Sequence, residues 1–106
     1  MKLFWSKQAQ RDIEEIVSYY KPVAGIRTTQ KMVQKIHAGV LHLAANPRAG
    51  RREDLLEDSP QEYRRVIVGS YKIIYCIKEE TVYISTVFDT RRNPEVLRQN
   101  LLGADA

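Results

Sequence analysis

The sequence predicts an α+β fold in which a small antiparallel sheet packs on an α-helical hairpin, in the order β-α-α-β-β-β-α. Two observations predict it. Apolar residues recur at helical spacing between residues 7 and 45, whereas residues 63–88 are rich in Val, Ile, Tyr and Thr and are interrupted by two-residue breaks. The 106 residues are 43% hydrophobic and 28% charged, which suits a single domain over residues 1–106. Cys76 is the only cysteine, so an internal disulfide is excluded and a cytoplasmic location is the simplest expectation.

The first half of the chain predicts a short strand and two helices. Residues 3–5 form an edge strand, and the Ser6 hydroxyl caps the helix that follows. Lys21-Pro22 ends this helix, because proline disfavours helical geometry in the residue before it. The second helix begins near Ala24 or Gly25 and ends at Asn46-Pro47. The apolar faces of the two helices comprise Ala9, Ile13, Ile16, Val17 and Tyr20, then Thr29, Val33, Ile36, Val40 and Leu43.

The second half predicts a meander of three strands over Tyr63–Val68, Tyr71–Lys78 and Thr81–Phe88. Gly69-Ser70 is a good tight-turn pair, whereas Glu79-Glu80 is a poor one, so a longer second turn stays open. Residues 48–62 are polar and rich in turn formers. Asn93-Pro94-Glu95 begins a last helix, and residues 103–106 are expected to be a frayed tail.

Two-residue turns fix which side chains share a face of the sheet. Val68 then lies opposite Tyr71, Cys76 opposite Tyr83, and Ile74 opposite Ser85. The face expected to pack under the helices shows Val66, Val68, Tyr71, Ile73, Tyr75, Ile77, Val82, Ile84 and Phe88. The other face shows Tyr63, Arg65, Ile67, Lys72, Ile74, Cys76, Tyr83, Ser85 and Val87. We expect a ligand on this second face, which we predict to be open.

The formal net charge is +4, and it is unevenly distributed. Residues 1–45 hold seven basic and three acidic residues, which accounts for the whole excess, and residues 46–106 hold ten of each sign in blocks. Such blocks can build a local positive surface for a nucleic acid or an acidic protein partner, although a solvated surface explains them equally well. No apolar run approaches the ~20 residues of a membrane-spanning helix, so we expect no membrane partner.

The arginines are the candidate functional residues. Arg65 is predicted to point from a central strand into the second face, and Arg91-Arg92 follow the last strand, where a loop can bring them beside that face. A guanidinium binds phosphate with two hydrogen bonds and stabilises negative charge. The alternative is that Arg65 pairs with an acid such as Asp89 or Glu62. His37 and His42 are five residues apart, a spacing that does not favour a metal site, and we expect neither metal nor cofactor.

Two runs of the chain, residues 63–75 and 87–94, resemble the RelE/ParE superfamily of toxins from bacterial toxin–antitoxin modules. The Ala9-x-x-Asp12-Ile13 and Asn46-Pro47-x-x-Gly50-Arg51 patterns fit the same family. The resemblance spans about residues 3 to 98. It implies an antiparallel sheet on an α-hairpin, and a plasmid-maintenance or stress toxin held inactive by a co-expressed antitoxin.

The superfamily has two mechanisms. RelE-like members cut messenger RNA on the ribosome with basic residues plus a C-terminal tyrosine or histidine, whereas ParE-like members inhibit DNA gyrase. By resemblance, Arg65 and Arg91 match the arginines of the nuclease branch, with Lys72, Arg64 and Arg92 as further binding residues. Leu97 stands where the nucleases have their tyrosine or histidine, and Tyr83 is the weak substitute. The ParE-like branch is therefore favoured.

Three hypotheses follow from the resemblance: a gyrase-binding toxin, a ribosome-dependent endoribonuclease that uses Arg65 and Arg91, and an inactive relic that only binds its antitoxin. In all three the antitoxin is a partner. An acidic or amphipathic segment would lie along the basic hairpin, where Lys31 and Lys35 flank the apolar stripe, or add to the first strand. A homodimer and a toxin–antitoxin hetero-oligomer are both compatible with this reading.

Overall fold

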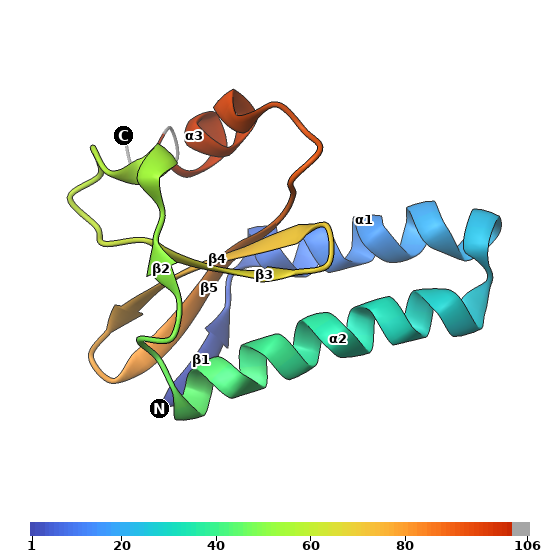
Figure 1. The fold of residues 1–106 in the computed structure, drawn as a ribbon, viewed down its shortest axis with the longest axis horizontal. Coiled ribbons are helices and arrows are strands. Elements are labelled where there is room, and N and C mark those ends of the chain that lie inside the picture. Colours follow the sequence, from blue (N-terminus) through green and yellow to red (C-terminus); the bar gives the residue numbers. More distant parts are fainter. Residues whose placement is uncertain (103–106) are drawn as a thin grey trace.

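The computed structural model describes residues 1–102, and the tail predicted for residues 103–106 lies outside the described residues. The elements run in the order β1 (Lys2–Trp5), α1 (Lys7–Ala24), α2 (Ile26–Ala45), β2 (Arg51–Arg52), the 3₁₀ helix η1 (Asp54–Leu56), β3 (Arg64–Val68), β4 (Tyr71–Lys78), β5 (Thr81–Asp89) and α3 (Pro94–Leu102) (Figure 1). The predicted order is confirmed, with two short additions, β2 and η1, inside the stretch expected to be turns.

The strands form one five-stranded sheet in the order β1-β5-β4-β3-β2. β3, β4 and β5 make the predicted antiparallel meander, and β2 extends it at one edge. β1 forms the other edge, as predicted, but runs parallel to β5, so the sheet is mixed. The Ser6 hydroxyl accepts a hydrogen bond from the Ala9 N–H at 2.9 Å, which confirms the predicted cap of α1.

The predicted register holds beside both turns of the meander. Val68 pairs with Tyr71 and Cys76 with Tyr83. The Glu79-Glu80 turn is two residues long, with φ of 48° and 63°. These are the left-handed conformations that a tight hairpin needs, adopted here by residues that rarely favour them.

A bulge on β5 overturns one part of the face assignment. Ile74 pairs with Thr86 instead of Ser85, because the register shifts between Ile74 and Tyr75. One extra residue reverses the alternation of side chains beyond it. Val87 therefore packs on the helix side and Phe88 on the second face, the reverse of what we predicted for these two residues.

Helix α1 does not end at Pro22. Pro22 lies inside the helix, which continues to Ala24. The proline removes only the hydrogen bond to the Ser18 carbonyl, and Ser18 is exposed, so water can replace it. Gly25, with φ of 84°, separates α1 from α2, and its N–H donates to the Lys21 carbonyl at 3.2 Å. Within residues 1–102, no helix combines the length and apolar character needed to cross a bilayer.

The sheet is covered on both faces. One face packs against α1 and α2 as predicted, through a core of Ala9, Ile16, Ile36, Val40, Leu43, Tyr71, Ile73, Tyr75, Val82, Ile84 and Val87. The expectation of an open second face is wrong, because η1 and α3 lie across the sheet from the hairpin (Figure 1). They bury Leu56, Tyr63, Ile74, Cys76, Phe88, Leu97 and Leu101 there. The part of this face over β2 and β3 stays partly accessible.

Candidate functional site

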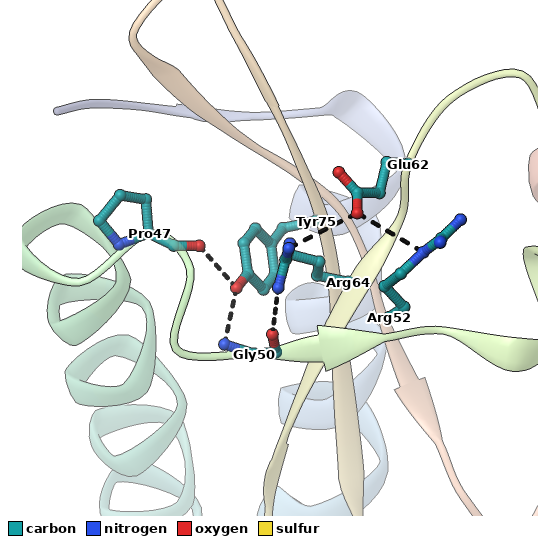
Figure 2. A network of polar contacts seen from close by, with 6 residues as sticks. All are labelled: Pro47, Gly50, Arg52, Glu62, Arg64 and Tyr75. Atoms are coloured by element: carbon teal, nitrogen blue, oxygen red, sulfur yellow. Dashed lines mark hydrogen bonds and ion pairs between the residues drawn. The ribbon is translucent and has the colours of Figure 1, made fainter.

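A network of hydrogen bonds fixes the loop between α2 and β2 (Figure 2). The Tyr75 hydroxyl donates to the Pro47 carbonyl at 2.8 Å and accepts from the Gly50 N–H at 2.9 Å. Arg64 Nη1 donates to the Gly50 carbonyl at 2.7 Å. Burial raises the pKa of the Tyr75 hydroxyl, so the group stays a proton donor at neutral pH. The sequence motif Asn46-Pro47-x-x-Gly50 is thus a loop tied to the central strand of the sheet.

Three arginines are displayed by this loop and by the strand that follows it. Arg48, Arg51 and Arg52 are exposed, and we call them the arginine edge. Arg52 Nε lies 3.5 Å from Glu62 Oε1. The side chains of Arg48 and Arg51 form no ion pair or hydrogen bond with any residue from 1 to 102.

Arg65 is held on the second face of the sheet by an acid that we did not predict as its partner. Its Nη1 lies 3.6 Å from Glu53 Oε2 and donates to the Arg52 carbonyl at 2.5 Å. Lys72 Nζ lies 3.1 Å from both carboxylate oxygens of Glu53. Glu53 is only 3% exposed, so two cations compensate one buried carboxylate. Arg64, by contrast, lies on the opposite face of the sheet, where its guanidinium donates to the Gly50 carbonyl of the loop.

Arg91 lies at the other end of the sheet and on its helix side. Its Nε and Nη2 each donate to Asp89 at 2.9 Å, and Nη2 also donates to the Tyr20 hydroxyl on α1 at 2.8 Å. This guanidinium holds the pKa of Asp89 below its usual range and lowers the pKa of Tyr20. Arg92 is exposed, with its guanidinium carbon 5.7 Å from the centre of the Phe88 ring.

Around Arg91 the structure forms a cleft of about 380 Å³ between α1 and the end of β5. Its lining combines acidic, phenolic and basic groups, from Asp12, Glu15, Tyr19, Tyr20, Tyr71, Asp89, Arg91 and Arg92. Arg65 is not among them. The expectation that Arg65 and Arg91 gather on one open face is therefore wrong: the strand-end loop turns Arg91 towards α1 because Asp89 and Tyr20 bind it there.

The remaining predicted site residues are dispersed. Tyr83 is partly buried in the second face, with its ring 5.3 Å from that of Phe4 and Lys78 Nζ 5.8 Å from its centre. Lys31 and Lys35 are exposed on α2. Among the described residues, no group of three His, Cys, Asp or Glu side chains is placed to hold a metal ion.

One important polar residue was not singled out as a site from the sequence. Asp12 is buried on α1, and its Oδ2 accepts from the Thr86 hydroxyl at 2.5 Å and from the Val87 N–H at 2.9 Å. Its Oδ1 accepts from Gln8 Nε2 at 2.9 Å. The carboxylate thus joins α1 to the strand beyond the bulge. An acid on the apolar face of a helix, between Ala9 and Ile16, is the signal that could have revealed it.

The Arg91 network yields a testable titration. Replacing Arg91 by Gln removes the group that lowers both pKa values, so we expect the pKa of Asp89 and of Tyr20 to rise. A carboxyl with a depressed pKa stabilises the fold above its unfolded pKa, and this contribution is lost as the pH falls through its folded pKa. The stability difference between wild type and Arg91→Gln should therefore shrink in acid. NMR titration of both side chains tests this.

Arg92→Gln is the matched control, because Arg92 contributes least to the Asp89 shift and is not among the causes of the Tyr20 shift. Unchanged pKa values in Arg91→Gln, or an equal rise of the Tyr20 pKa in the control, would contradict the assignment of the network.

Comparison with known proteins places the chain in a family. The family described as ParE toxin of type II toxin-antitoxin system, parDE, matches residues 3–94. A solved structure described as a chromosomal ParDE toxin–antitoxin system from P. aeruginosa is similar, with a TM-score of 0.70 and 25% sequence identity. The match covers 84% of this chain and 95% of that chain. A search of curated protein sequences gave no match.

The mixed sheet on a helical hairpin and the family match define the class of protein, a toxin of the RelE/ParE superfamily. Within that class, the chain belongs to the ParE toxin family of type II toxin–antitoxin systems.

Proposed function

We propose that this chain is a toxin that is neutralised by a cognate antitoxin in the cytoplasm and that acts by binding DNA gyrase. The observation that carries the proposal is the separation of Arg65 and Arg91 on opposite sides of the sheet. Each guanidinium is already paired with a carboxylate, Glu53 or Asp89. Two arginines so placed cannot stabilise one phosphoryl group together, because such stabilisation needs donors aimed at a common point.

The C-terminal helix gives further support. The nuclease branch of the superfamily places a tyrosine or histidine where this chain has Leu97, and Leu97 is 0% exposed. The side chain at this position of α3 packs into the second face of the sheet and does not reach a substrate. The sequence has no histidine after His42 and no tyrosine after Tyr83. A toxin that acts by binding requires none of these groups.

The helical hairpin is the surface that we propose for the antitoxin. Large apolar side chains are exposed near its tip, with Tyr19, Val23 and Ile26 exposed by 66%, 70% and 55%. A groove between α1 and α2 is lined by Val17, Lys21, Ile26, Thr29, Gln30, Val33 and Gln34. Lys31 and Lys35 are exposed on α2, one of the two helices that form this groove. An amphipathic, acidic segment would cover the apolar patch and meet the lysines at its rim.

The decisive experiment is a supercoiling assay with purified gyrase and purified toxin. We expect inhibition that the antitoxin relieves, and unchanged messenger RNA in a translating extract. Arg65→Ala should not remove the inhibition, provided that the variant is folded. Absence of inhibition at micromolar toxin contradicts the proposal.

The other outcomes are distinguishable in the same set of measurements. Cleavage of messenger RNA that Arg65→Ala and Arg91→Ala both abolish would favour the endoribonuclease. Unaffected growth when the toxin is expressed without antitoxin would favour an inactive, antitoxin-binding relic.

A further inference from the structure

The arginine edge is a positive surface to which the proposed function assigns no role. Arg48, Arg51 and Arg52 lie within five residues of the chain, all exposed. Across residues 1–102, Arg52 alone of the three forms an ion pair, with Glu62, and that pair is itself exposed, which makes it a weak compensation. Glu53, the next residue, is buried and already shared by Arg65 and Lys72. The charge at this edge is therefore largely uncompensated.

The fold holds this edge rigidly. Three hydrogen bonds fix the backbone at Pro47 and Gly50 (Figure 2). The Tyr75 hydroxyl donates to Pro47 and accepts from the Gly50 N–H, and Arg64 donates to the Gly50 carbonyl. β2 pairs with β3 immediately afterwards, so the backbone under Arg51 and Arg52 is also fixed. Because the backbone of the loop is already ordered, the free energy of binding includes no cost for ordering the loop. Consecutive residues of a strand point to opposite faces, so Arg51 and Arg52 flank the edge on its two sides.

We propose that the arginine edge binds the phosphate backbone of a nucleic acid, a duplex in preference to a single strand. The inference does not depend on gyrase being the target. Arginine binds phosphate with two parallel hydrogen bonds, and phosphate contacts alone suffice for binding that ignores sequence. Single strands are bound mainly by stacking bases on aromatic rings. Tyr63, which directly precedes β3, and Tyr75 of β4 are buried and cannot serve.

A protein partner fits this edge less well. Stable protein interfaces are centred on buried apolar or aromatic anchors. Within the described chain, the large exposed apolar residues all lie outside residues 46–53, at Met1, Phe4, Tyr19, Val23, Ile26, Leu41 and Ile67. The arginine edge presents three guanidinium groups and no large exposed apolar side chain, which suits a phosphate backbone.

The test measures how salt weakens binding of the toxin to a fluorescein-labelled DNA duplex of about twenty base pairs. Fluorescence anisotropy reports the binding, and gyrase is left out. Three phosphate contacts give a slope of log K against log salt of about −2.7, or roughly a 40-fold loss of affinity between about 50 and 200 mM salt. In the double variant Arg48→Gln/Arg51→Gln the slope should fall to about −0.9. Neither side chain has an ion pair or hydrogen bond within residues 1–102 to lose, so the variant should fold, which its thermal unfolding checks.

Arg11→Gln/Arg27→Gln is the matched control, because it removes the same charge from exposed arginines on α1 and α2. It should leave the slope unchanged. Equal weakening in the control, or no binding of the duplex at low salt, overturns the proposal. Tighter binding of a single-stranded RNA of the same length, or binding of polyglutamate in place of the duplex, also overturns it.

Discussion

Gly50→Ala is expected to destabilise the fold by about 3 kcal/mol, because a methyl group has no room at this position. A Cβ on Gly50 would lie 2.5 Å from the Tyr75 hydroxyl oxygen and 2.6 Å from the Arg65 carbonyl oxygen. The Tyr75 hydroxyl would have to move, which breaks its hydrogen bonds to Pro47 and Gly50 and leaves buried polar groups unpaired. Urea denaturation of the variant measures the loss.

Gly39→Ala is the matched control. Gly39 lies inside α2, where alanine is favoured over glycine by about 1 kcal/mol. A Cβ there meets the Val68 side chain at 2.9 Å and no backbone atom. We expect the two effects to offset each other, leaving the free energy of unfolding within about 1 kcal/mol of wild type. Equal stability of Gly50→Ala and Gly39→Ala would contradict the role assigned to the Tyr75 network.

Asp12→Ala is expected to have a comparable effect, a loss of about 3 kcal/mol, for an electrostatic reason. The variant leaves the Val87 N–H and the Thr86 hydroxyl without an acceptor, and both lie in the buried contact between α1 and β5. A buried donor that loses its partner costs its full desolvation penalty. Chemical denaturation again gives the free energy of unfolding.

Glu15→Ala provides the comparison for Asp12. Glu15 is exposed on the same helix and lines the same cleft, but it makes no ion pair or hydrogen bond within the described chain. Its loss should change stability by no more than about 0.5 kcal/mol. Thr86→Val, which removes one of the two donors, should cost less in the Asp12→Ala background than in wild type. An additive double mutant would contradict the coupling.

Much of the fold followed from local signals. The helical stripes, the Ser6 cap and the turn after Val68 are short-range features, and each was predicted from a few adjacent residues. The break after Lys78 was also predicted, although its length was left open. The bulge on β5 was not predictable in this way. The register shift lies between Ile74 and Tyr75 of β4, and Asp12, on a helix more than seventy residues earlier in the chain, accepts from the Val87 N–H beside it. The exchange of Val87 and Phe88 between the faces follows from the extra residue of the bulge, which strand alternation alone does not reveal.

The candidate site was harder to predict than the fold. Strand alternation placed Arg65 on the second face correctly, but alternation says nothing about a residue beyond the strand, such as Arg91. Its position depends on Tyr20 and Asp89, which both accept hydrogen bonds from its guanidinium. The path of the chain after Asp89 determines that Leu97 and Leu101 cover the second face, and no local signal in the sequence reveals that path.

The parallel pairing of β1 with β5 has a consequence for synthesis of the protein. Leu3 pairs with Val82 and Trp5 with Ile84, so about eighty residues must leave the ribosome before the first strand finds its neighbour. Closing so long a loop is entropically costly and slows folding. The nascent chain therefore exposes the apolar side of residues 2–5 until residues 81–84 have emerged, and the native sheet is completed only then.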